Sequence, residues 1–238
     1  MPRRKQLDSF GECTMQHAGM ELTRHAEIPW QARVNVDGWP NRAGMYFDDP
    51  VTKLCIRIVD YPVGSVEPRH VHAGFHATTV LQNRAIVDGL TLRPLDVIIG
   101  PSNEPHGPLD YPEGCKLLSA FQGSYFHSEV EKLSGKKEYR LIEQAKLPWR
   151  DCGNGIKAKT LVDHGCGDLL VEVLKFAPGA SIARHASARL LTALVIEGDV
   201  VVGKHKLGVW DFISVPKGMM HGPVSFPAGA TLLALSLP

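Results

Sequence analysis

The sequence predicts an all-β protein built from two copies of one module, each a β-sandwich or jelly-roll barrel. The first observation is an internal repeat, because one constant offset pairs residues of the first half with identical residue types in the second half. The second is the local pattern, since runs rich in Ile, Val and Leu, such as 53–60 and 169–176, are separated by short Gly, Pro and Asn turns. Many short strands with such turns are typical of sandwiches and jelly rolls. The repeated pairs are Gly64 and Gly179, Arg69 and Arg184, His70 and His185, Val80 and Val195, Asp96 and Asp211, Pro101 and Pro216, His106 and His221, and Gly114 and Gly229.

The repeat divides the 238 residues into three parts. Residues 1–27 show little periodicity and are predicted to be an N-terminal extension ahead of the first barrel. The first module is predicted over 28–146 and the second over 147–238, because Ile-Pro-Trp at 28–30 returns as Leu-Pro-Trp at 147–149. The polar link at 126–146 is expected to be a loop or a short helix.

Histidines are concentrated in the first module. His70 and His72 are two residues apart, so on a strand both imidazoles would project from the same face. His76 follows them, and His106 stands after an apolar run and a turn. Surface histidines on an edge strand would explain a bare His-x-His pair. Four imidazoles in this arrangement instead predict a metal site, because neutral imidazole is the commonest protein ligand for Zn, Fe, Ni and Cu.

This pattern resembles the two signature motifs of the cupin superfamily. The resemblance implies a double-stranded β-helix, or jelly-roll, barrel in each module, and a metal held by His70, His72, His76 and His106. His76 falls where the family usually has Glu, so the implied site is made of imidazoles alone. The matching positions are Gly64, His70 and His72 in the first motif and Asp96, Pro101 and His106 in the second, while Asn83 replaces the usual Gly.

The second module departs from the motif. Ser187 stands where the first module has His72, and Leu191 stands where it has His76. Only His185 and His221 remain, and two imidazoles alone make a poor site for a divalent metal. The second barrel is therefore predicted to be metal-free and to serve packing.

The resemblance also implies a range of activities. In its His-x-His-x-Gly-x-His run the first module looks like acetylacetone-cleaving and dihydroxyacetophenone-cleaving dioxygenases, which predicts Fe(II) chemistry that cleaves a C–C bond in a small diketone or aryl ketone. No catalytic side chain is predicted apart from the metal centre itself. One divalent ion is expected, with Zn(II) or Ni(II) as the alternatives to Fe(II). The other functions are a non-catalytic zinc sensor of the ChrR type and an O₂-independent isomerase or cyclase.

The chemistry of the predicted metal ligands indicates what kind of substrate the site would bind. Without a carboxylate ligand the metal keeps its full positive charge, so the substrate is expected to be an anionic or enolisable chelator. Metal-bound histidines usually donate their second N–H to a carboxylate or carbonyl, and Glu67, Glu104 and Gln122 are the candidate acceptors.

Composition excludes several functions. Lys and Arg number 26 against 25 Asp and Glu, which argues against nucleic acid or a membrane surface as partner. No apolar run approaches the roughly 18–20 residues that span a bilayer. The five cysteines contain no Cys-x-x-Cys pair, which predicts free thiols in a reducing cytoplasm. A homodimer is compatible with these features.

Overall fold

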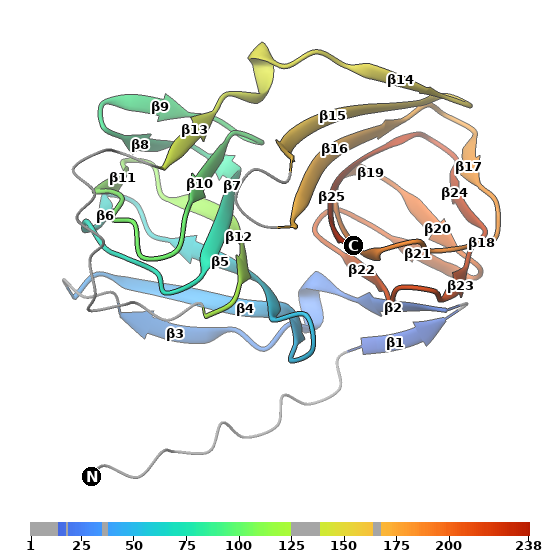
Figure 1. The fold of residues 1–238 in the computed structure, drawn as a ribbon, viewed down its shortest axis with the longest axis horizontal. Coiled ribbons are helices and arrows are strands. Elements are labelled where there is room, and N and C mark those ends of the chain that lie inside the picture. Colours follow the sequence, from blue (N-terminus) through green and yellow to red (C-terminus); the bar gives the residue numbers. More distant parts are fainter. Residues whose placement is uncertain (1–13, 18, 35–37, 125–138, 164–167) are drawn as a thin grey trace, which may run out of the picture.

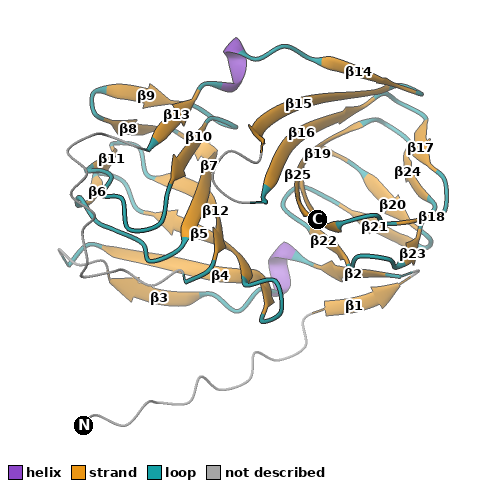
Figure 2. Ribbon diagram, viewed as in Figure 1, coloured by secondary structure: helices purple, strands orange, loops and turns teal. Residues whose placement is uncertain are grey.

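The computed structural model describes residues 14–17, 19–34, 38–124, 139–163 and 168–238. Strands dominate this part of the chain, together with two 3-10 turns, η1 at His25–Glu27 and η2 at Gln144–Lys146. Two barrels lie side by side (Figure 1), and β-structure fills both of them (Figure 2). The all-β, two-barrel prediction is confirmed. Among the described residues no helix has the length and apolar character to cross a membrane.

The first barrel consists of a seven-stranded sheet facing a four-stranded one. Their strand orders are β13-β10-β7-β12-β5-β4-β3 and β6-β11-β8-β9. Neighbouring strands are antiparallel. The strands are β3 Gln31–Val34, β4 Pro40–Asp49, β5 Leu54–Tyr61, β6 Ser65–Glu67, β7 Phe75–Asn83, β8 Ala85–Val87, β9 Leu90–Leu92, β10 Val97–Gly100, β11 Leu109–Tyr111, β12 Cys115–Gln122 and β13 Arg140–Ile142.

The second barrel repeats this plan. Its sheets have the orders β1-β2-β22-β19-β25-β16-β15-β14 and β17-β24-β20-β21, and β18 pairs with β23. The strands are β1 Thr14–His17, β2 Met20–Thr23, β14 Arg150–Gly153, β15 Ile156–Asp163, β16 Leu170–Phe176, β17 Ala180–Ile182, β18 His185–Ala186, β19 Leu190–Gly198, β20 Val200–Val202, β21 His205–Leu207, β22 Phe212–Val215, β23 Met220–His221, β24 Val224–Phe226 and β25 Ala230–Leu237.

Strand β5 shows how each large sheet serves two cores. Side chains alternate between the faces of a strand, so Leu54, Ile56 and Ile58 point away from the barrel interior. They join a buried cluster that also contains Val171 and Leu233 of the second barrel. The other face of β5 lines the interior of the first barrel. The two barrels therefore share a continuous hydrophobic core between their large sheets.

The N-terminal segment belongs to the second barrel, a role that the prediction of a simple extension missed. Strand β2 pairs with β22, and the backbone N–H of His25 donates to Asp211 Oδ1 at 2.9 Å. The linker before the second barrel does the reverse, because β13 pairs with β10 and the N–H of Gln144 donates to Asp96 Oδ1 at 2.8 Å. The segment that precedes the first module therefore pairs with the second barrel, and the segment that precedes the second module pairs with the first barrel. Residues 126–138 of the link lie outside the described residues, as do residues 1–13.

We expect residues 147–238 expressed alone to be insoluble or to self-associate. The fragment would expose the buried face around Val171 and Leu233 and would lose the pairing of β22 with β2. Exposed apolar faces of this kind drive association. Size-exclusion chromatography with light scattering, with the full chain as control, measures the outcome. A soluble, folded monomer of the fragment would contradict the expectation.

Candidate metal centre

Two of the predicted ligands reach the site from irregular backbone. His70 and His72 lie between β6 and β7, so their prediction on a regular strand is wrong. His70 instead forms an isolated antiparallel bridge with His106, in which each backbone N–H donates to the other's carbonyl at 3.0 Å. This bridge fixes the two imidazoles side by side although they are far apart in sequence. His76 does lie on a strand, β7, beside β10 and β12.

Three of the imidazoles form a compact, buried group. The ligand atoms of His70, His72 and His106 all lie within 4.8 Å of one another. The Nε2 atoms of His70 and His72 are 3.0 Å apart, about the separation of two nitrogens at a right angle on a metal with bonds of about 2.1 Å. The ring centroid of His106 is 4.2 Å from that of His70. The group therefore has the ligand type, spacing and burial to hold one divalent metal ion.

His76 lies against this group but outside it. Its ring centroid is 4.5 Å from that of His106, while its Nε2 atom faces the α-carbon of Gly100, where a Cβ would meet it. His76 Nδ1 lies 3.3 Å from Thr78 Oγ1, and Nε2 is buried without a hydrogen-bond partner. Leaving such an atom unsatisfied costs about 1–3 kcal/mol. The role of His76 as a fourth metal ligand stays a prediction.

The environment keeps the imidazole of His76 neutral. Burial is the main reason that the pKa of His76 lies well below its usual value, and the neighbouring His106 and His70 lower the pKa further. A neutral ring keeps a lone pair available for a metal. The site thus favours the protonation state that ligation needs.

Backbone carbonyls, and not the predicted acceptor side chains, lie next to the Nδ1 atoms of two histidines. His70 Nδ1 is 2.7 Å from the carbonyl of Pro68, and His106 Nδ1 is 3.5 Å from the carbonyl of Glu104. Such contacts orient an imidazole with Nε2 toward the metal. The Glu104 side chain is buried, but it is the backbone of this residue that makes the contact. Gln122 follows the cavity-lining part of β12 and does not line the cavity itself.

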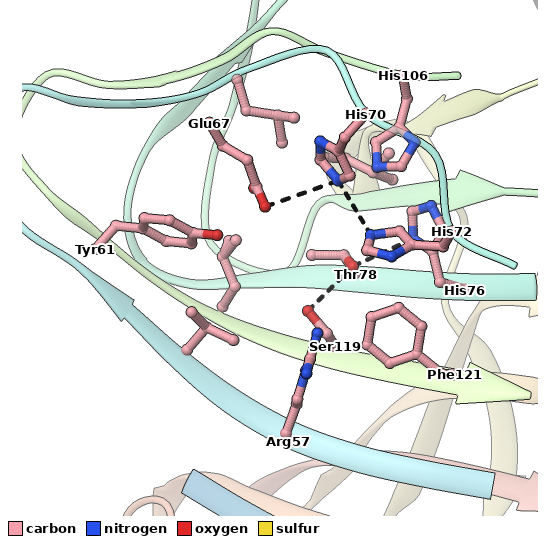
Figure 3. Close-up of a pocket in the computed structure, with 14 residues that line it drawn as sticks. Arg57, Tyr61, Glu67, His70, His72, His76, Thr78, His106, Ser119 and Phe121 are labelled. Atoms are coloured by element: carbon pink, nitrogen blue, oxygen red, sulfur yellow. Dashed lines mark hydrogen bonds and ion pairs between the residues drawn. The ribbon is translucent and has the colours of Figure 1, made fainter. Parts of the chain in front are cut away.

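An enclosed cavity of about 40 Å³ opens beside the histidines, which is room for about three water molecules. Figure 3 shows Tyr61 and Glu67 on the side of the cavity away from His76, and Arg57 reaching toward Ser119 from below the histidines. Glu67 Oε1 lies 3.7 Å from His70 Nε2. Most of the remaining wall residues are apolar. These remaining residues are Val59, Thr78, Ile98, Leu109, Leu117, Ser119 and Phe121.

The carboxylate of Glu67 is held by a pair of tyrosines. The hydroxyl of Tyr111 donates to Glu67 Oε2 at 2.9 Å. Tyr61 stacks on Tyr111 with ring centroids 4.4 Å apart and also hydrogen-bonds Glu67. Burial, together with the nearby Glu67 charge, keeps the pKa values of both phenols well above their usual value. The hydroxyls therefore stay protonated and can donate.

Sequence reasoning missed Arg57 and the two tyrosines. Arg57 is the one charged residue in the run Leu-Cys-Ile-Arg-Ile-Val, which begins at Leu54. A lone cation in an otherwise apolar strand was the available signal, because charged side chains are rarely buried unless something pairs with them.

The second barrel keeps the scaffold of the site without its full ligand set. His185 pairs with His221 in register, and their ring centroids are 4.2 Å apart, as in the pair of His70 and His106. Ser187 and Leu191 supply no imidazole. In the parts of the chain described here, the three-ligand group found is the one in the first barrel.

Residues 137–237 match the family model described as the ChrR cupin-like domain. This match covers the second barrel, whereas the histidine motifs that carry the sequence resemblance are most complete in the first. None of the curated proteins matches the chain in sequence.

Solved structures share the fold at low sequence identity. A Nostoc punctiforme protein, provisionally assigned as a dioxygenase, has a TM-score of 0.78 and 13% identity over 92% of this chain and 82% of its own. An oxalate decarboxylase of Lactobacillus farciminis has a TM-score of 0.67 and 11% identity over 91% and 85%. A vicilin from hazelnut, Corylus avellana, has a TM-score of 0.63 and 10% identity over 91% and 85%. These likenesses show the architecture and not the reaction, because one fold hosts many activities.

The paired jelly-roll barrels, the motif around His70 and His106, and the match over the second barrel lead to the same assignment. The match over residues 137–237 and the fold shared with the solved structures support a protein of the cupin superfamily.

Proposed function

We propose that the protein is a non-haem Fe(II) dioxygenase that cleaves a C–C bond in a small diketone or related ketone. The observation that carries the proposal is the buried group of His70, His72 and His106 beside an enclosed cavity, with no carboxylate in the ligand group. In such a reaction both atoms of O₂ enter the products and one C–C bond breaks. The products are a carboxylic acid and a second carbonyl fragment.

The metal would supply Lewis acidity toward a carbonyl oxygen and, as Fe(II), the redox chemistry that O₂ requires. The chain's own residues do the rest. Neutral imidazoles bring no negative charge to the ligand group, which favours an anionic or enolised ligand. The Glu67 carboxylate lies beside this group, with Oε1 3.7 Å from His70 Nε2. Ile98, Leu117 and Phe121 give part of the wall an apolar surface, and beside such a surface electrostatic interactions with the ligand are stronger than in solvent.

The size of the cavity bears on the substrate. A volume of about 40 Å³ suits a compact ligand, and it favours a small diketone over an aryl ketone among the expected substrates.

The three described free thiols, Cys55, Cys115 and Cys152, support a place of action in a reducing compartment such as the cytoplasm.

A metal-sensing role is the second candidate, and the match of residues 137–237 to the ChrR cupin-like domain favours it. A sensor would need the same metal site and no turnover. Zn(II) has no redox chemistry. It would therefore suit a sensor or an isomerase but would not support an oxygenase.

We expect O₂ uptake with acetylacetone to require the Fe(II)-loaded protein and to vanish when Zn(II) replaces Fe(II). The protein is stripped with a chelator, reloaded anaerobically with either metal and placed in an oxygen electrode. Free Fe(II) at the same concentration is the control. Anaerobic turnover by the zinc-loaded protein would exclude the oxygenase in favour of an isomerase or cyclase. Full Fe(II) occupancy without O₂ uptake over a panel of diketones would support the sensor.

A further inference from the structure

An open groove lies at one end of the second barrel, on the side away from the first barrel (Figure 1). The turn between β14 and β15 and the end of β16 form its walls. Its volume is about 530 Å³, against about 40 Å³ for the cavity beside the histidines. Pockets that bind small molecules commonly measure about 300–1,000 Å³, so the groove has room for a ligand.

The internal repeat gives this groove a counterpart in the first barrel. Residues 40–42 and 60–62 line a smaller groove of about 300 Å³. An offset of 115 residues carries them onto 155–157 and 175–177, and all six of these positions line the groove of the second barrel. The same end of each barrel is therefore hollowed, and the two grooves can be compared position by position.

In the first barrel the protein's own charges satisfy one another at this position. Asp60 Oδ2 lies 2.6 Å from Arg42 Nη2 and 3.1 Å from Lys116 Nζ. The Arg42 guanidinium also lies over the indole of Trp30, with Cζ 4.6 Å from the ring centroid. A carboxylate therefore neutralises the cations of the first groove, and a planar group covers its tryptophan.

In the second barrel this carboxylate is replaced by a cation. Lys175 stands at the position of Asp60. Lys157, in place of Arg42, lies directly opposite Lys175 in the sheet register, and Thr231 lies opposite Lys175 on the other side. Like charges directly opposite on neighbouring strands destabilise a sheet. A negative charge held between the two lysines would remove this cost.

Asp151 lines the groove but does not neutralise the lysine pair. It lies opposite Lys157 in the pairing of β14 with β15, and its Oδ1 atom accepts the backbone N–H of Gly153 at 2.8 Å. Among the described residues neither Lys157 nor Lys175 has a carboxylate oxygen within ion-pair distance of its ammonium group. The positive charge of the pair is thus available to a ligand.

Trp149 gives the groove an aromatic surface. It corresponds to Trp30 in the repeated Pro-Trp, is 43% exposed and lines the groove. Lys159 Nζ lies 4.7 Å from the centroid of its ring and also donates to the carbonyl of Gln144 at 2.8 Å. Lys159 does not line the groove, so the part of the indole that does is open to a planar ligand.

We propose that this groove binds a small anion that carries an aromatic ring, with the anionic group between Lys157 and Lys175 and the ring stacked on Trp149. Two ammonium groups match a doubly charged group, and lysine is a common partner of phosphate. A phosphate monoester carries a charge of about −1.5 to −2 at pH 7. The ligand class is therefore an aromatic phosphate monoester, such as a nucleoside monophosphate. This site is separate from the metal centre and does not depend on the function proposed for it.

The test titrates the full-length protein with adenosine monophosphate and, as its two fragments, with adenosine and inorganic phosphate. Isothermal calorimetry measures each affinity. We expect the monophosphate to bind more tightly than either fragment, and its affinity to fall as salt is added because exposed charges are screened. Trp149→Leu should weaken its binding by about 5- to 100-fold, as the removal of a base-stacking side chain does.

The lysine variants separate the charge from the ring. Lys175→Met should weaken binding of the monophosphate by about 5-fold, the effect of one exposed ion pair, and leave adenosine binding unchanged. Lys175→Asp gives Lys157 the kind of partner that Arg42 has in the first barrel, so the monophosphate should no longer bind more tightly than adenosine.

Lys206→Met is the matched control, because it removes the same charge from an exposed lysine of the same barrel. Lys206 pairs with Asp199 at 2.7 Å and does not line the groove, so its loss should leave the affinity unchanged. Protein stripped of metal with a chelator should also bind the monophosphate normally. The site would be excluded by three results: no binding to the wild type, binding that is lost with the metal, or equal losses in Lys175→Met and Lys206→Met.

Discussion

His106→Ala is expected to reduce the metal content of the purified protein from one ion per chain to almost none. The substitution removes one of three imidazoles whose ligand atoms lie within 4.8 Å of one another. The loss of affinity should exceed the roughly 10- to 100-fold that follows removal of an outer-shell partner. The backbone bridge between His70 and His106 does not depend on the side chain, so the barrel should remain folded. Elemental analysis of protein purified without a metal-affinity tag measures the outcome, and circular dichroism checks the fold.

Two further variants sharpen this experiment. Changing His185 and His221 together should leave the metal content unchanged, because the second barrel offers no third imidazole at the equivalent positions. His76→Ala distinguishes a three-ligand site from a four-ligand site, since only the latter loses affinity. Full occupancy in His106→Ala would exclude the proposed centre. A drop by half in the double variant would mean that the second barrel also binds metal.

Asp211→Ala is expected to destabilise the protein by about 3 kcal/mol, because it breaks a partly buried ion pair and leaves two backbone N–H groups without their acceptor. Asp211 accepts hydrogen bonds from the backbone N–H groups of His25 and Gly208 at 2.9 and 3.0 Å. Its Oδ2 atom also lies 2.7 Å from Nη1 of Arg24. The contacts with Arg24 and His25 tie the N-terminal segment to the second barrel, while the contact with Gly208 holds the turn before β22. The melting temperature should fall by about 6–12 °C.

Asp199→Ala is the control for this prediction. Asp199 forms an exposed ion pair with Lys206 at 2.7 Å, and such surface pairs contribute about 0–1 kcal/mol. Differential scanning calorimetry of both variants separates a general effect of losing a carboxylate from the loss of the contacts that Asp211 makes. If Asp211→Ala melted within a degree or so of Asp199→Ala, the N-terminal segment would not be a stabilising part of the second barrel.

The histidine site shows which features of a metal centre the spacing of residues in the sequence can predict. The motif brought His70, His72 and His106 into one prediction, and the structure brings their ligand atoms together. His70 and His72 lie outside any regular strand, but their Nε2 atoms are 3.0 Å apart, so the two rings do project to the same side as the two-residue spacing predicts. The spacing of histidines in the sequence identifies the candidate ligands. The backbone bridge between His70 and His106 determines how close their side chains lie.

The sequence by itself determined the all-β class, the two repeated barrels and the histidine group, because alternation, turn residues and a constant repeat offset are properties of neighbouring or equivalent positions. Only the tertiary structure decided what shares the cavity with those histidines. Arg57 is 13 residues before His70 in the printed sequence and enters the site because β5 pairs with β12. The exchange of preceding segments between the barrels was likewise invisible in the sequence. The contacts of Asp96 with Gln144 and of Asp211 with His25 join residues far apart along the chain, and such long-range pairing follows from packing and not from local preference.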